Sequence, residues 1–180
     1  MCGRGHFFVP RFTSRPTLCT VPENRGAPRG LRVYTQVILG TAVTVATVVF
    51  HIAGLVVLIM LLNRIAPSFE KRLHPRVGTS LLIIIAVLGT ILVHTIEVWA
   101  WALLYVYLGE FTDVATALYF SVSTATTVGY GDIILTPAWQ VLGTFESMSG
   151  LILFGASTAF LFGLVRHLFE QLPRPLRPKS

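Results

Sequence analysis

Residues 126–132 read Thr-Thr-Val-Gly-Tyr-Gly-Asp and lie between two long apolar segments, 77–108 and 141–165. Each segment contains one charged residue and exceeds the roughly 20 residues that a helix needs to cross about 30 Å of hydrocarbon. Residues 113–125, directly before the motif, are predicted to form a helix too short to span, capped by Thr112 or Asp113. A half-helix followed by a glycine-bearing stretch between two spans indicates a re-entrant loop. Such irregular backbone is tolerated at membrane depth only where it is buried in protein or lines water, so we expect an aqueous path beside the motif.

The rest of the chain is also too apolar for an ordinary soluble domain. Of its 180 residues, 53% are hydrophobic and 12% are charged, and the mean hydropathy is +0.71. A further segment, 33–62, has no charged residue at all. The sequence therefore predicts three spanning helices, at 33–62, 79–108 and 139–167. A soluble helical bundle is disfavoured because these segments lack polar residues at helical spacing.

The formal net charge of +6 comes from basic residues that, apart from Arg166, lie outside the predicted spans. Those outside the spans lie in an N-terminal tail (1–32), a loop (63–78) and a C-terminal tail (168–180). In a membrane protein such charges set topology and attract anionic lipid, so we expect a lipid partner and no nucleic acid. Prolines recur through the N-terminal tail, which predicts that it is disordered.

Glycines at 129 and 131 give the motif an alternating pattern. Glycine adopts backbone angles that other residues disfavour, so successive carbonyls can all point towards one axis. A ring of such carbonyls replaces the water shell of a cation such as K⁺. Five extended residues cover at most about 17 Å, which is enough for several ion positions in a row.

The motif and its position resemble the filter signature of the potassium-channel family. The resemblance covers about 80–167 and leaves out the first helix and both tails. It implies an all-α membrane protein with three transmembrane helices, a re-entrant pore helix (113–125) and a selectivity filter (127–131), assembled as a homotetrameric pore. The outer helix would be 79–108 and the inner helix 139–167.

The resemblance also assigns roles within the filter. The carbonyls of Thr127, Val128, Gly129 and Tyr130, with the Thr127 hydroxyl, would line the K⁺ positions, and Gly131 would complete the filter. Asp132 would lie at the outer mouth, where a carboxylate ring concentrates cations. The pore helix should aim its partially negative C-terminal end at a central cavity.

The pore helix departs from the family pattern in two places. Tyr119 and Phe120 stand where many relatives carry two tryptophans, and Phe120 has no hydrogen-bond donor. Ser123 stands where some relatives carry a glutamate that pairs with the outer aspartate. Together with Thr126, these residues are expected to support the filter, with a stiffness that differs from the usual arrangement.

Five positions in the inner helix are singled out. Gly150 resembles the hinge glycine of inner pore helices and is followed by Gly155, although glycines in membrane helices also mark close packing. Ser157 and Thr158 fall where hydroxyls would line a cavity. Glu146, near the outer end, is expected to reach the membrane interface.

Glu97 is an ionisable group inside a span, which is costly and therefore a functional hypothesis. His94 lies three residues earlier on the same helical face. Glu97 is predicted either to brace the filter through Ser123 or neighbouring backbone, or to form a buried pair with His94 that only sets packing. His51, in the first helix, is predicted to be a packing residue.

Topology follows from the filter, whose entrance must face outwards. The loop 63–78 and the C-terminal tail are then cytoplasmic, as their basic character requires. The arginines of the N-terminal tail fall outside, against that rule, unless the native start lies downstream. The cell membrane is the expected location.

The sequence thus predicts a passive potassium channel subunit with no substrate other than the permeant ion. No span carries arginine at every third position, so no voltage sensor of the usual kind is expected. A non-selective cation channel and a non-conducting regulatory subunit are the alternatives. An enzyme is disfavoured because His94, Glu97 and Glu146 make no nucleophile–base set or metal cluster.

Overall fold

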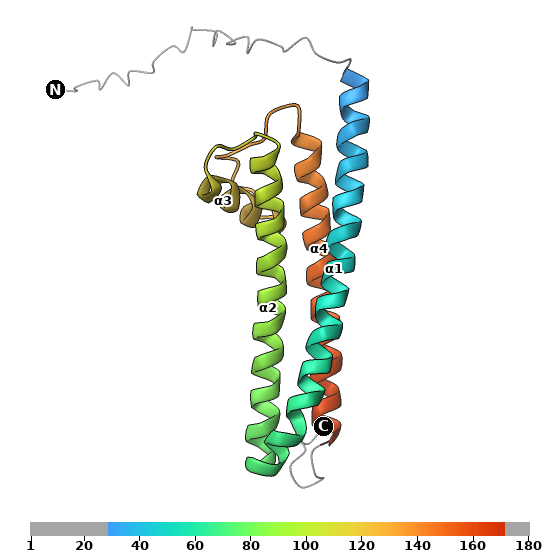
Figure 1. The fold of residues 1–180 in the computed structure, drawn as a ribbon, viewed down its shortest axis with the longest axis vertical. Helices are drawn as coiled ribbons and strands as arrows, with labels where there is room; N and C mark the ends of the chain where they lie inside the picture. The colour runs from blue at the N-terminus through green and yellow to red at the C-terminus, as the bar shows by residue number, and fades with distance from the viewer. Residues whose placement is uncertain (1–28, 172–180) are drawn as a thin grey trace, which may run out of the picture.

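The computed structural model describes residues 29–171, with side chains at 33–69 and 73–170. It contains four helices: α1 (Arg29–Arg72), α2 (Pro75–Tyr107), α3 (Val114–Ala125) and α4 (Gln140–Gln171). The three long helices run alongside one another, and α3 lies at one end beside α2 and α4 (Figure 1). All three are long and apolar enough to cross a membrane. The chain is therefore a multi-pass integral membrane protein, and the predicted all-helical fold is confirmed. The predicted tails lie largely outside the described residues.

The α1 helix is longer than predicted. It continues through Pro67 to Arg72, so most of the loop predicted at 63–78 is helical. Side chains on this extension pack against a cluster from the preceding turns of α1 and from α2, which stabilises the helix beyond the membrane-spanning part. These packing residues are Ile65, Ala66 and Phe69, and the cluster is Leu58, Leu62, Leu82 and Ala86.

The connection to α2 is correspondingly short. Only Leu73 and His74 separate the helices, and α2 begins at Pro75. Proline suits the first position of a helix because its fixed φ is already helical and its missing N–H would have no partner there. Pro75 therefore starts a helix rather than breaking one.

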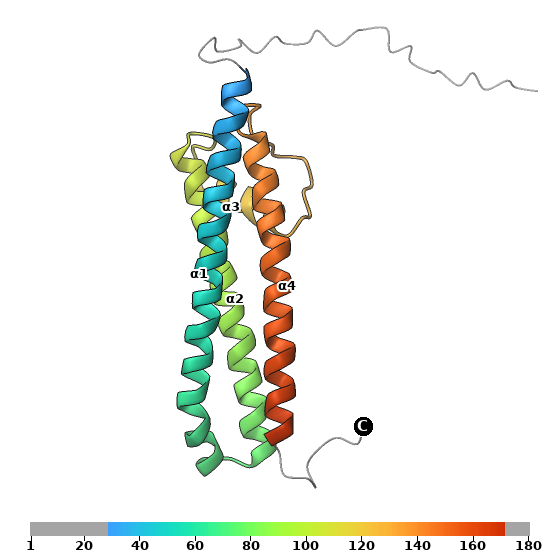
Figure 2. The same ribbon diagram turned by 90° about the vertical axis from the view of Figure 1, so that its right-hand side faces the viewer.

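Glycines bring α1 close to the other spans. A Cβ at Gly40 would lie 2.6 Å from the ring of Phe145 on α4, and one at Gly54 would lie 3.0 Å from Val93 on α2. Small residues permit this approach between membrane helices. Figure 2 shows α1 beside both α2 and α4. The first helix is thus docked along its length rather than attached only by its connection.

A polar contact fixes the same arrangement at the end near α3. The side-chain oxygen of Gln36, which is buried, accepts a hydrogen bond of 3.0 Å from the backbone N–H of Val141. The first N–H groups of a helix have no partner within it. Gln36 of α1 therefore satisfies one of these groups in the first turn of α4.

We predict that Gly40→Ala loosens α1 from α4. The added methyl must displace the Phe145 ring, and overpacking of this kind costs about 1 kcal/mol or more. Thermal unfolding in detergent, followed by circular dichroism, should show a lower midpoint. Gly163→Ala is the matched control, because nothing lies within 4 Å of its Cβ position. Equal midpoints for the two variants would contradict the close packing.

Candidate functional site

The short helix α3 starts at a side-chain cap. Asp113, one of the two predicted caps, accepts hydrogen bonds from the backbone N–H (2.8 Å) and the hydroxyl (3.0 Å) of Thr116. These bonds, the backbone one foremost, lower the pKa of Asp113 and keep it ionised. A negative charge at a helix N-terminus also complements the helix dipole. The predicted pore helix at 113–125 is therefore present as α3 at Val114–Ala125.

The C-terminal end of α3 rests on α4. A Cβ at Gly150 would lie 2.1 Å from the carbonyl oxygen of Ala125, so only glycine fits this position. One turn away, the Ser147 hydroxyl donates to the Thr124 carbonyl at 3.0 Å. The contact with Ala125 thus supports close packing as the reason for glycine at position 150. A Cβ at Gly155, by contrast, would meet nothing within 4 Å. The hinge stays a prediction for both glycines.

The filter segment has an alternating backbone. Positive φ angles occur at Thr127 (61°), Gly129 (49°) and Gly131 (77°), whereas Val128 and Tyr130 have negative ones. In an ordinary β-strand, successive carbonyls point to opposite sides of the chain. When the sign of φ alternates from residue to residue, each peptide plane is rotated relative to the next, so successive carbonyls can point to the same side. Thr127 adopts an angle that is uncommon for a non-glycine residue, and such strain persists only where the surroundings hold the chain.

Three bonds fasten this segment to α3, the first from the Thr127 N–H to the Thr124 carbonyl at 3.0 Å. The Gly129 N–H donates to the carbonyl of Ser123 at 3.0 Å. The Tyr119 hydroxyl donates to Asp132 Oδ2 at 2.8 Å. That bond raises the pKa of Tyr119 and keeps the phenol a donor at neutral pH. Residues 127–132 are thus tied to the helix before them at their start, their centre and their end.

The other predicted support residues act within α3 or its packing. Phe120 is buried and meets Tyr105 of α2 edge to face, with ring centroids 5.3 Å apart. Ser123 donates to the Phe120 carbonyl, and Thr126 donates to the Val122 carbonyl. Phe120 therefore supports α3 by packing, and the hydroxyls of Ser123 and Thr126 bond to their own helix rather than to the filter.

The sequence reasoning missed the role of Glu146. This side chain is 1% exposed and lies behind α3, not at the membrane interface as predicted. The Tyr105 hydroxyl donates to its Oε2 at 2.7 Å, and the Ser121 hydroxyl donates to its Oε1. Ser121 also contacts the Val98 carbonyl at 3.0 Å. One carboxylate therefore links α2, α3 and α4. The sequence contained a signal for this role, because an acidic residue inside a predicted span needs polar partners.

Glu97 forms the predicted buried pair with His94, and it has a further partner that was not predicted. It pairs with His51 of α1 and with His94, and Ser157 of α4 contacts both histidines. The bracing of Ser123 by Glu97 is therefore wrong, because the Ser123 hydroxyl bonds within α3. His51, predicted to be a packing residue, also pairs with the Glu97 carboxylate.

The cavity prediction for Ser157 is wrong, because its side chain is buried and its hydroxyl contacts both histidines. Thr158 is exposed, and its hydroxyl donates to the Phe154 carbonyl.

Comparison with known proteins agrees with this geometry. A protein-family model described as "Ion channel" matches residues 80–167. Residues 80–167 form an ion channel domain. The domain contains α3, residues 126–132 and most of α2 and α4, whereas α1 lies outside it. No curated protein matches the chain, and no solved structure does. The expectation of a channel rather than an enzyme is confirmed.

We predict that Tyr105→Phe destabilises the channel domain. It removes the donor to Glu146 Oε2 and leaves a buried oxygen without that bond, which costs about 1–3 kcal/mol. Amide hydrogen exchange over 114–131 should speed up, and the thermal unfolding midpoint should fall. Tyr107→Phe is the matched control, because Tyr107 is 87% exposed. Unchanged exchange in Tyr105→Phe would show that the Glu146 link does not hold α3.

A second prediction separates packing from hinge action in α4. Gly150→Ala places a methyl against a backbone oxygen that cannot rotate away, so we expect a loss of about 3 kcal/mol. Gly155→Ala should leave stability unchanged or slightly raised, because its Cβ is unobstructed and alanine favours helix. Unfolding midpoints measured in the same detergent compare the two. A stable Gly150→Ala protein would refute the contact with Ala125.

Proposed function

We propose that this chain is a potassium-selective channel subunit that conducts K⁺ passively through a homotetrameric pore. The observation that carries the proposal is the alternation of φ at residues 127–131 in the motif Thr-Val-Gly-Tyr-Gly, within an ion channel domain. Backbone carbonyls that share one side can replace the hydration shell of a dehydrated cation. The same motif with ordinary extended backbone would present only every second carbonyl.

In this proposal the residues of the filter have different roles. Carbonyls of Thr127, Val128, Gly129 and Tyr130, with the Thr127 hydroxyl, line successive K⁺ positions, and Gly131 gives the turn its freedom. Asp132, oriented by Tyr119, adds negative charge at the outer mouth. The C-terminal end of α3 supplies the partial negative charge of a helix terminus on the inner side.

Assembly as a homotetramer is supported by the exposure of the filter in one chain. Residues 126–132 are all exposed, with Val128 at 51% and Tyr130 at 74%. Backbone polar groups at membrane depth need protein or water around them. A single chain offers one wall of a pore, and four copies around an axis close the carbonyl ring of a potassium filter.

The arrangement of the helices supports an orientation in the cell membrane. The filter and the start of α1 lie at the same end of the molecule (Figure 1). If that end faces outwards, Arg64 and Arg76 lie at the cytoplasmic end, where basic residues favour the anionic leaflet. No series of arginines at every third position occurs in the spans, so conduction is proposed to be leak-like.

Flux from liposomes tests the proposal. Purified protein reconstituted into liposomes should release K⁺ in clear preference to Na⁺, and Ba²⁺ should block the release. Gly131→Ala should abolish the preference, because a Cβ at φ +77° is strained by about 1 kcal/mol or more and distorts the outer filter. Gly163→Ala, with open space around its Cβ position, should conduct like the native chain.

Native mass spectrometry of the same sample should give four chains per particle. Equal K⁺ and Na⁺ flux would favour a non-selective cation channel. Absence of flux from an intact tetramer would favour a non-conducting regulatory subunit. Either result would overturn the proposed selectivity or conduction.

A further inference from the structure

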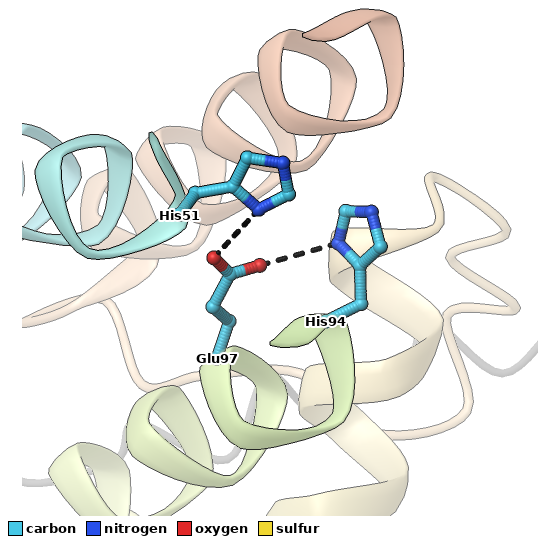
Figure 3. A group of neighbouring side chains, drawn as sticks. All are labelled: His51, His94 and Glu97. Carbon is cyan, nitrogen blue, oxygen red and sulfur yellow. Dashed lines mark hydrogen bonds and ion pairs between the residues drawn. The ribbon is translucent and has the colours of Figure 1, made fainter. Parts of the chain in front are cut away.

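A polar cluster lies between the three long helices, outside the filter. His51 comes from α1, His94 and Glu97 from α2, and Ser157 from α4. Figure 3 shows both imidazole rings turned with Nδ1 towards the Glu97 carboxylate. His51 Nδ1 lies 2.9 Å from Glu97 Oε1, and His94 Nδ1 lies 3.2 Å from Glu97 Oε2. Three side chains from two helices therefore converge on one point.

The cluster is withdrawn from solvent and from lipid. His51 is 0% exposed, Glu97 is 4% exposed, and only His94 is partly open. An ionised carboxylate in such surroundings is costly unless it is paired or coordinates a cation. Glu97 Oε2 has no hydrogen bond in the described structure, although it lies close to His94 Nδ1. A buried oxygen is thus aimed at the centre of the cluster without a fully formed partner.

Ser157 occupies the opposite side of both rings. Its Oγ lies 2.9 Å from His94 Nε2 and 3.0 Å from His51 Nε2. A hydroxyl has one hydrogen to donate but two lone pairs that accept. When both Nε2–H groups donate to Ser157, both Nδ1 atoms present lone pairs towards the carboxylate. Three Lewis bases then face one another, and a cation between them balances the arrangement.

We propose that His51, His94 and Glu97 form a binding site for a divalent transition-metal ion of the Zn²⁺ class. One ligand atom from each residue lies within 4.8 Å of the others. Two imidazoles and a carboxylate are a ligand set that Zn²⁺ takes, with a fourth position left for water. Hard ions such as Mg²⁺ prefer all-oxygen sites. Ser157 acts as the outer partner that fixes the tautomer and orientation of both histidines.

A metal here joins α1 to the ion channel domain. His51 belongs to α1, which lies outside residues 80–167, whereas the other members belong to that domain. Glu97 is also the neighbour of Val98, whose carbonyl oxygen lies 3.0 Å from the Ser121 hydroxyl oxygen of α3. Metal binding would therefore fix the first helix against α2 and α4 close to the support of the pore helix. The site does not depend on which ion the filter selects.

Metal binding to the full chain in lipid nanodiscs tests the site. The protein should carry no polyhistidine tag, and Co²⁺ serves as the spectroscopic probe with Zn²⁺ as competitor. We expect one Co²⁺ per chain, a visible absorption of four-coordinate type, and displacement by Zn²⁺. His94→Gln and Glu97→Gln should each abolish the signal, and Ser157→Ala should weaken binding by about 10–100-fold. His74→Gln, which removes an exposed histidine at the start of α2, should bind like the native chain.

His94→Cys separates a ligand role from a structural one. Glutamine keeps hydrogen-bonding groups but binds metal poorly, whereas cysteine is a strong metal ligand with weak hydrogen bonding. His94→Cys should therefore retain stoichiometric Co²⁺ and add a thiolate-to-cobalt charge-transfer band. Absence of saturable binding in the native chain, or equal binding in His94→Gln and His74→Gln, would overturn the proposal and show that the cluster takes protons only.

Discussion

Residues 127–131 are irregular backbone between two long apolar helices, and their contacts with α3 hold them in place. Such backbone cannot leave its polar groups facing lipid, and Thr127 additionally carries an uncommon φ. The segment is therefore fixed from behind by α3, through the Gly129 N–H and the Tyr119 hydroxyl. The α3 helix in turn packs on α4, where the absence of a side chain at Gly150 leaves room for the Ala125 carbonyl.

Two carboxylates inside the spans are buried, and each joins helices that apolar contacts alone would position less specifically. Glu146 collects hydroxyl donors from α2 and α3, so an acid on α4 sets the distance between the pore helix and both of its neighbours. Glu97 faces the other way, towards α1, and meets two imidazoles. The contrast lies in the partners: Glu146 accepts hydrogen bonds from two hydroxyls, whereas the two imidazoles beside Glu97 carry nitrogen lone pairs that can bind a metal ion together with the carboxylate.

The first helix, although outside the matched domain, is fitted to it by three kinds of contact. Glycines at 40 and 54 permit close approach, Gln36 satisfies an N–H in the first turn of α4, and His51 enters the polar cluster. Each contact lies at a different level along α1. A helix attached at one level could pivot, whereas one attached at several moves only with its neighbours. The position of α1 is thus coupled to that of α2 and α4, which carry the filter between them.

The sequence by itself determined the three spans and the short helix before the motif, and it limited the cap of that helix to Thr112 or Asp113, because hydrophobic length and helix capping are local properties. It also identified the motif, whose alternating glycines anticipate the alternating φ angles. Only the tertiary structure decided the partners of the buried polar groups. Tyr105 and Glu146 are 41 residues apart, His51 and Glu97 are 46 apart, and His51 and Ser157 are 106 apart. Which face of one helix meets which face of another depends on how glycines and large side chains interlock across the bundle. No local pattern encodes that fit, and for the same reason the extension of α1 through Pro67 followed from packing against α2 rather than from its own sequence.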